Sequence, residues 1–282
     1  MINYNSILLV EEEDYLVVIE YIGDEKVVEI PEKIQGKKVI EIERGAFRFC
    51  DCLEEVMLPN SITKIGESAF SDCVNLKRVV ISSALETIES YAFFNCKLLS
   101  EINFPPSLLS IGNETFRNCE AITKVNLPDS VNHVGVFAFR DCKTLDSVSL
   151  SNSLVEVSIG MFMSCELLKK IDFGGSIQQI NNSSFSGCKS LDVLKLPEGL
   201  ITIGKSDDRV GLKALMISDP DLYYGSFTLC ESLNEVHFPR SIKFIENNSF
   251  YRSESIRTVY MSKEIKDIVH PLFDSNVTFI EV

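Results

Sequence analysis

Residues 65–76 read IGESAFSDCVNL, and the pattern of this stretch returns along most of the chain. Its cysteine recurs at an unbroken spacing of 23 residues, at Cys50, Cys73, Cys96, Cys119, Cys142, Cys165 and Cys188. A fixed period of this length is typical of a solenoid, in which each repeat forms one coil stacked on the last. The spacing therefore predicts one elongated repeat domain.

The positions around each cysteine repeat as well. Phenylalanine stands three residues before it and a large aliphatic residue three residues after it, as Phe70 and Leu76 do around Cys73. The phrase that follows, Val79-x-Ile81, alternates apolar and polar residues, which predicts a strand with one buried face. The second half of the coil carries apolar residues three apart. One coil cannot bury this surface alone, so neighbouring coils must stack.

The period also divides the chain into parts. The motif continues with Phe227 and Cys230 and then with Phe250, where Ser253 takes the cysteine position. The step from Cys188 to Cys230 exceeds one period by 19 residues, which predicts an insertion at 205–223. Residues 1–26 hold two apolar runs and are expected to form a β-rich N-terminal cap. Residues 27–282 are expected to form a solenoid of about ten 23-residue coils.

The repeated phrase resembles the BspA type of leucine-rich repeat, the 23-residue treponemal class, over roughly residues 27–282. Ser253 departs from this pattern, as do the insertion and Ser158 and Glu89, where the family often has glycine. The resemblance implies a leucine-rich repeat solenoid, a β-rich right-handed coil with a parallel sheet on one face and short turns or helical segments on the other. Such repeats are common in bacterial and protist surface proteins that bind host proteins or other cells.

Charge and hydropathy narrow the possible partners. A net charge of −14 argues against a nucleic-acid binder, which needs a basic surface, and against binding to anionic membranes. It favours a soluble monomer that repels its own copies. No stretch approaches the 18 or more apolar residues of a membrane span, so no membrane insertion is expected. The first residues lack the basic and apolar regions of a signal peptide. As written, the chain is expected to be cytoplasmic, whereas the resemblance favours the cell surface or secretion.

The cysteines and histidines indicate structure rather than chemistry. The seven regular thiols occupy one inward position and point in parallel, so we expect buried free thiols and no disulfides. The close pair Cys50 and Cys52 lacks the second pair that a zinc site requires, and Cys52 is the thiol expected to react. The three histidines fall into no triad-like arrangement, and no phosphate-binding loop is present. We therefore expect no catalytic site, no metal and no cofactor.

A ladder of serines also recurs, just before the first apolar residue of the return half. Serine at a tight bend can bond backbone groups that the turn leaves unpaired, which predicts hydrogen bonds between coils. These serines are Ser61, Ser107, Ser130, Ser153, Ser176 and Ser241.

Two surfaces are candidates for binding a protein partner. The first is the outward side of the sheet, whose mixed charges and few aromatic residues favour a protein over a sugar; the alternative is a merely solvated sheet. Its candidate residues are Glu55, Met57, Arg78, Glu101, Asn103, Lys124, Asn126, Lys170, Asp172, Lys195, Glu235, His237 and Tyr260. The second is the insertion, which is more apolar than a surface loop needs; the alternative is that it folds back onto its coil. Its candidate residues are Leu212, Leu215, Met216, Tyr223 and Tyr224.

Three functional hypotheses follow. The leading one is a non-enzymatic protein-binding module for surface adhesion or host contact through the sheet face. The second is an intracellular interaction scaffold with the same fold, which the missing signal and the free thiols support. The third is a regulatory or enzymatic subunit that uses the insertion, and deletion of that segment separates it from the other two.

Overall fold

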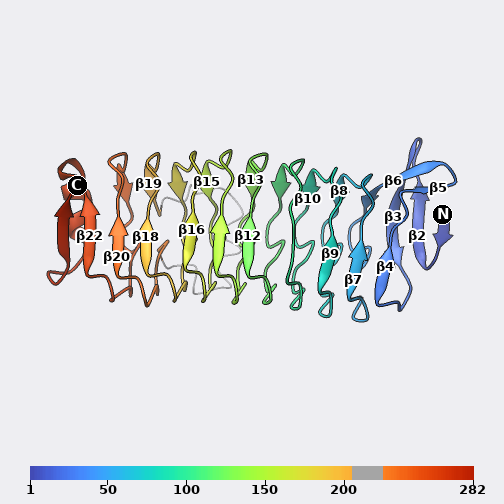
Figure 1. The fold of residues 1–282 in the computed structure, drawn as a ribbon, viewed down its shortest axis with the longest axis horizontal. Coiled ribbons are helices and arrows are strands. Elements are labelled where there is room, and N and C mark those ends of the chain that lie inside the picture. The colour runs from blue at the N-terminus through green and yellow to red at the C-terminus, as the bar shows by residue number, and fades with distance from the viewer. Residues whose placement is uncertain (205–224) are drawn as a thin grey trace.

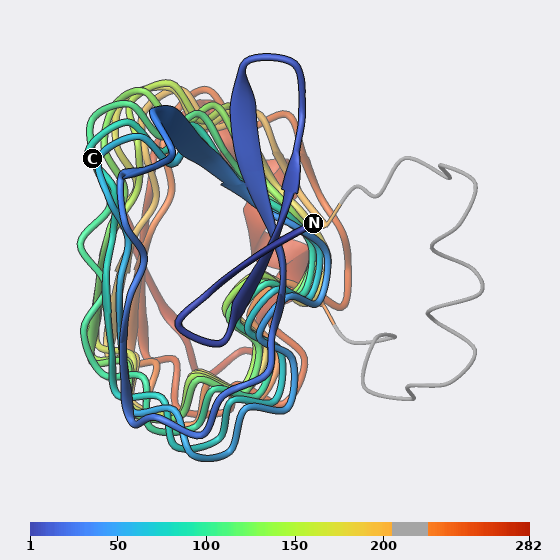
Figure 2. The same cartoon turned by 90° about the vertical axis from the view of Figure 1, so that its right-hand side faces the viewer.

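The structure is a computed structural model that describes residues 1–204 and 225–282. Short strands and turns wind into coils that stack along one axis (Figure 1), as the 23-residue period predicts. Seen along that axis, the coils superimpose on one another and carry parallel strands on two sides (Figure 2). We call these two rows of strands the front ladder and the return ladder.

The front ladder is the predicted sheet, and its described strands fall into three hydrogen-bonded groups, within each of which they pair in parallel. Glu55 lies beside Arg78, and Lys124 lies beside Ser147 and then Lys170 along the axis. The central residue of each strand is apolar and points inward, as Val56 and Val125 do. The strands are β4 (Val27–Glu29), β7 (Glu55–Met57), β9 (Arg78–Val80), β12 (Lys124–Asn126), β14 (Ser147–Ser149), β16 (Lys170–Asp172), β18 (Val193–Lys195), β20 (Glu235–His237), β22 (Thr258–Met261) and β23 (Thr278–Glu281).

The return ladder adds a second row of parallel strands on the side where the resemblance implies turns or helical segments. Two apolar residues three apart, such as Ile62 and Ile65, are both buried, and the backbone between them is extended enough to pair with the next coil. The strands are β6 (Lys37–Ile42), β8 (Lys64–Ile65), β10 (Thr87–Ile88), β11 (Ser110–Ile111), β13 (His133–Val134), β15 (Glu156–Val157), β17 (Gln179–Ile180), β19 (Thr202–Ile203) and β21 (Phe244–Ile245).

The two ends of the described chain differ from the coils between them. At the N-terminal end, β1 (Ile2–Tyr4), β2 (Ile7–Glu11) and β3 (Tyr15–Tyr21) pair antiparallel, and β3 then pairs in parallel with β6. The short strand β5 (Lys33–Ile34) pairs with β6 from the other direction. Near the C-terminal end, a helical segment joins β22 to β23. It consists of η2 (Lys263–Ile265), α2 (Lys266–Val269) and η3 (His270–Leu272).

A stack of phenylalanine rings forms the centre of the core. Consecutive rings lie 4.9 to 5.6 Å apart and nearly parallel, as in the pair Phe70 and Phe93, whose planes differ by 1°. Phe185 stacks on Phe227 in the same way at 5.3 Å. The coils on either side of residues 205–224 are therefore direct neighbours. The predicted insertion, with its candidate contact residues, lies outside the described part of the chain.

Side-chain hydrogen bonds between coils accompany the stack. The hydroxyl of Ser107 donates to the carbonyl of Leu85 at 2.7 Å, and Ser61, Ser130 and Ser241 make the equivalent bond. This confirms the predicted role for four of the six serines. All nine cysteines are free thiols, and each regular one from Cys73 onward donates to a phenylalanine carbonyl of the preceding coil.

Candidate binding surfaces

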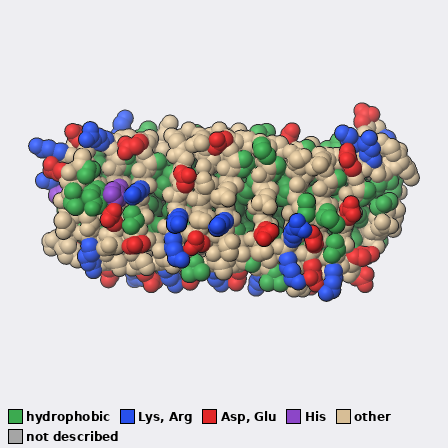
Figure 3. Space-filling model, viewed as in Figure 1, with side chains coloured by type: hydrophobic (Ala, Val, Ile, Leu, Met, Phe, Trp, Pro, Cys, Tyr) green, Lys and Arg blue, Asp and Glu red, His purple; other side chains and the backbone are tan. Residues whose placement is uncertain are grey.

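The front ladder brings all thirteen sheet residues named from the sequence onto one side of the molecule. Most of them are exposed, whereas Glu55, Met57, Glu235, His237 and Tyr260 are half-buried. Figure 3 shows this side, where charges of both signs are scattered among uncharged side chains. Glu101 belongs to no named strand but forms an isolated bridge with Arg78, so it keeps the register of the row.

Ion pairs link neighbouring coils at the N-terminal half of the front ladder. The guanidinium of Arg78 lies 2.8 Å from the carboxylate of Glu55 in the preceding coil. Glu54 lies just before β7 and accepts hydrogen bonds from Lys26 at 2.7 Å and from Lys77 at 2.5 Å. These two ammonium groups lower the pKa of Glu54 to about 2. Much of the charge on this part of the face is thus paired within the chain.

An aromatic pair lies at the C-terminal half of the front ladder. The rings of His237 and Tyr260 stack with centroids 4.2 Å apart and planes within 4°, and the carboxylate of Glu235 lies 2.5 Å from Nε2 of His237. The strand register places His237 directly beside Tyr260. The sequence shows few aromatic residues on this face, but it does not show that two aromatic rings meet there.

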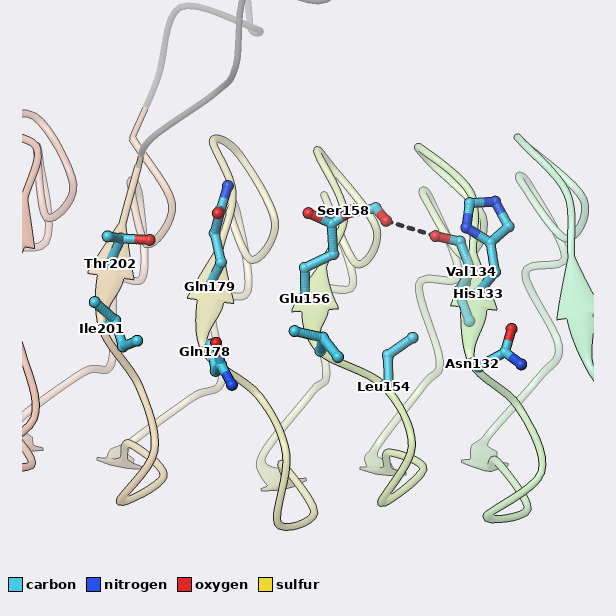
Figure 4. A pocket seen from close by; sticks show the side chains of 11 residues that line it. Asn132, His133, Val134, Leu154, Glu156, Ser158, Gln178, Gln179, Ile201 and Thr202 are labelled. Atoms are coloured by element: carbon cyan, nitrogen blue, oxygen red, sulfur yellow. Dashed lines mark hydrogen bonds between the residues drawn. The ribbon is translucent and has the colours of Figure 1, made fainter.

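The return ladder carries two adjoining hollows that the sequence reasoning did not identify. One has a volume of about 360 Å³ and runs from Asn132 to Thr202 (Figure 4). The other, of about 470 Å³, runs from Glu67 to His133, which lines both. We call the two together the return trough. A signal was present in the sequence, since the outward residue of each return strand is polar over these coils. This row is Thr87, Ser110, His133, Glu156, Gln179 and Thr202.

The pairing of the return ladder stops between β13 and β15, beneath the first hollow. Among the described strands, β13 pairs with β11 and β15 pairs with β17, but neither pairs with the other. In neighbouring coils, the residue just after the return strand donates its backbone N–H to a carbonyl of the preceding coil, as Gly135 does to Ile111. Here the hydroxyl of Ser158 donates to the carbonyl of Val134 instead, as the dashed line in Figure 4 shows. The ribbon gap between these two coils is wider than its neighbours.

Within residues 1–204 and 225–282, no group of three or more His, Cys, Asp or Glu side chains could hold a metal ion. No helix in the same two ranges is long and apolar enough to span a bilayer. Cys50 and Cys52 are both half-buried. A hydrogen bond from Cys73 lowers the pKa of Cys50, whereas burial raises the pKa of Cys52. The pKa shifts thus favour a thiolate at Cys50 rather than at Cys52.

Comparisons with known proteins agree with the repeat pattern. A family described as the BspA type leucine rich repeat region matches in six copies, over residues 26–135, 109–207 and 220–282. The crystal structure of a leucine-rich repeat protein from T. pallidum is similar at 33% identity with a TM-score of 0.63, over 66% of this chain and 88% of that one. A leucine-rich repeat protein from Bacteroides ovatus shares the fold at 20% identity with a TM-score of 0.54, over 100% of this chain and 99% of that one. No curated protein matches the sequence.

Proposed function

Because the chain belongs to the BspA type leucine-rich repeat family, we propose that it is a non-enzymatic module that binds a protein partner on the outward side of its front ladder. Membership of this family is what suggests protein interaction. The outward side of the front ladder is the surface that we propose for this interaction, and the regular spacing of its side chains supports that choice. A solenoid presents the same outward position at each coil, so side chains far apart in sequence form one extended face.

The observation that carries the proposal is the ordered group Glu235, His237 and Tyr260. Binding energy at protein interfaces is concentrated in a few residues, and tyrosine is among the most enriched of them. The ring of Tyr260 is held against His237, and His237 is held by Glu235, so these side chains are already ordered before a partner arrives. Preorganised side chains lose less conformational entropy on binding. The exposed Lys124 and Lys170 farther along the face would supply charge that steers a partner.

A charge-reversal experiment tests the surface. The double variant Lys124→Glu/Lys170→Glu changes the front ladder, whereas Lys97→Glu/Lys143→Glu makes the same change of net charge on exposed turn residues. Both proteins and the wild type are used as bait against extracts of the source cells and against a panel of host proteins. A partner of the front ladder is retained by the wild type and the turn variant and lost by the front-ladder variant. Equal retention by all three would refute binding at this face.

The finer proposal is that the partner lies outside the cell and that the role is adhesion or host contact. Its support is the resemblance to repeats that are common in surface proteins. The alternative is an intracellular scaffold, which the seven buried free thiols favour because such thiols persist in a reducing compartment. Protease treatment of intact cells separates the two. Release of peptides of this protein supports the surface role, and protection until lysis supports the scaffold.

A further inference from the structure

The break in the return ladder leaves hydrogen-bonding groups facing the trough. In the next coils, the N–H of Gln178 bonds the carbonyl of Val155, and that of Ile201 bonds the carbonyl of Gln178. No equivalent backbone bond joins Val155 to Asn132 within the described chain. Among the described residues, the N–H of Val155 and the carbonyl of Asn132 therefore have no backbone hydrogen-bond partner, and both residues line the hollow. A ligand that offers both a donor and an acceptor can satisfy them.

The side chains around the break suit an amide-containing ligand. The carboxamides of Asn132 and Gln178 are exposed on either side of it, and each offers a donor and an acceptor. Peptide groups have the same two functions, so carboxamides can pair with a peptide backbone of any sequence. Leu154 and Ile201 line the same hollow and supply apolar contact. Tyr91 is the sole aromatic residue other than His133 among the described residues that line the trough, so a stacked sugar is less well served.

The charge of the trough selects a cationic occupant. Its described lining residues include Glu67, Glu89 and Glu156 but no lysine or arginine. Glu89 and Glu67 are paired with cations at the N-terminal end, with Lys64 at 3.0 Å and Arg44 at 3.5 Å. Glu156 accepts a hydrogen bond from the neutral amide of Asn181 and forms no ion pair with a described residue. The net charge of −14 adds a long-range attraction for cations.

The length of the trough sets the size of the occupant. The polar row from Thr87 to Thr202 spans several coils, each about 4.8 Å from the next. The row is therefore on the order of 25 Å long, which an extended peptide of about seven or eight residues would cover. A small ligand would fill only one hollow. We infer that the return trough binds an extended peptide that carries lysine or arginine, with one basic side chain placed at Glu156.

The test uses the full chain and the fluorescein-labelled octapeptide (Lys-Ala)4, with (Glu-Ala)4 and (Ser-Ala)4 as matched probes. Fluorescence polarisation measures their affinities at about 0.15 M salt, where distant charges are largely screened. We expect (Lys-Ala)4 to bind the most tightly. The variant Glu156→Gln should weaken it about fivefold, as loss of one charge pair would. The control Glu231→Gln removes the same charge from an exposed turn residue and should change the affinity by less than about twofold.

Hydrogen exchange locates the bound peptide. The amide of Val155 should exchange more slowly when (Lys-Ala)4 is present, while the amides of β14 on the front ladder stay unchanged. Equal weakening by Glu156→Gln and Glu231→Gln would show general charge attraction and overturn the inference. So would absence of binding, equal binding of (Ser-Ala)4, or protection on the front ladder. None of these results refutes the front-ladder proposal, because the two surfaces are probed by different residues.

Discussion

The thiol of Cys96 donates a hydrogen bond to the carbonyl oxygen of Phe70 at 3.0 Å, although 26 residues separate them in the sequence. The same bond joins Cys119 to Phe93 and Cys142 to Phe116. Each cysteine thus reaches the phenylalanine of the preceding coil, one period plus three residues away. The unbroken 23-residue spacing of cysteine and phenylalanine has this contact as its physical reason.

Thiol reactivity should follow this ladder. Burial raises the pKa of Cys230 to about 12 and holds that of Cys119 well above its usual range, so these thiols stay protonated and unreactive. Cys50 is half-buried and its pKa is lowered, so it should form more thiolate than Cys52 at any pH below about 9. Limited treatment of the native protein with iodoacetamide at about pH 8 should label Cys50 first and Cys52 more slowly.

Mass spectrometry of the labelled protein checks this order. The seven buried cysteines should react only after unfolding, and all nine cysteines should then titrate as free thiols without a reductant. The buried set is Cys73, Cys96, Cys119, Cys142, Cys165, Cys188 and Cys230. Labelling of Cys119 in the native protein at a rate close to that of Cys50 would contradict the burial argument. Oxidation of six or more cysteines would contradict the free-thiol ladder.

Gly112 lies very close to the backbone of the preceding coil, so a side chain should be costly there, although Glu89 and Asn181 carry one at the equivalent position of their own coils. A Cβ atom added there would lie 2.4 Å from the backbone nitrogen of Ser90. Such overpacking against backbone typically costs 1–3 kcal/mol, so Gly112→Ala should lower the free energy of unfolding by about 2 kcal/mol. Gly199→Ala is the matched control, since its added Cβ would meet its nearest neighbour at an ordinary 3.6 Å. Urea denaturation measures both variants, and equal stability of the two would refute the close approach.

The carboxylate of Glu54 should titrate at unusually low pH. Hydrogen bonds and charge from Lys26 and Lys77 lower its pKa to about 2 in the folded protein, whereas an unfolded glutamate titrates near 4.3. A depressed folded pKa contributes stability that is present above about pH 4.3 and is lost as the pH falls towards about 2. NMR titration of the side-chain carboxyl should give this midpoint. Lys77→Met should raise it, while Lys97→Met, on an exposed turn residue, should leave it unchanged.

Much of the fold could be predicted because the same residue pattern recurs in every coil. The period fixes the stacking, and the alternation around Val79 fixes which side of the front strand is buried. The return ladder was harder to predict. Its strands are two residues long, as in Lys64–Ile65, and they exist because the same backbone recurs one coil away. A strand stabilised by stacking has little signal in its own residues.

The candidate surfaces were predictable only in part. Register along the front ladder follows from the period, so the outward residues could be named. The ring contact of His237 with Tyr260 depends on side-chain orientation, which a pattern of residue types does not show. The return trough depends on a ladder break at one coil. Ser158 stands where the family often has glycine, but so does Glu89, and the return strands next to Glu89 still pair.

Replacing Ser158 should therefore show what opens the ladder. At the same position of other coils, Glu89 and Asn181 still donate their backbone N–H to Ile65 and Val157. A side chain alone does not break the pairing, since Asn181 donates both its side-chain amide and its backbone N–H to the carbonyl of Val157. Ser158 differs in that only its hydroxyl bonds the carbonyl of Val134. In Ser158→Gly this hydroxyl is gone, and the backbone N–H can take the carbonyl of Val134 as Gly135 takes that of Ile111.

The expected result is that β13 and β15 pair in this variant. The amide of Val155 should then exchange about tenfold more slowly, which corresponds to about 1.4 kcal/mol of local protection. Global stability should change by less than about 1 kcal/mol, because the hydrogen bond gained offsets the entropy cost of glycine. Ser153→Gly is the control, since it adds a glycine to the same coil at an exposed position and should leave the exchange of Val155 unchanged. Faster exchange in Ser158→Gly would mean that the hydroxyl holds the two coils together, and the hollow would then need another cause.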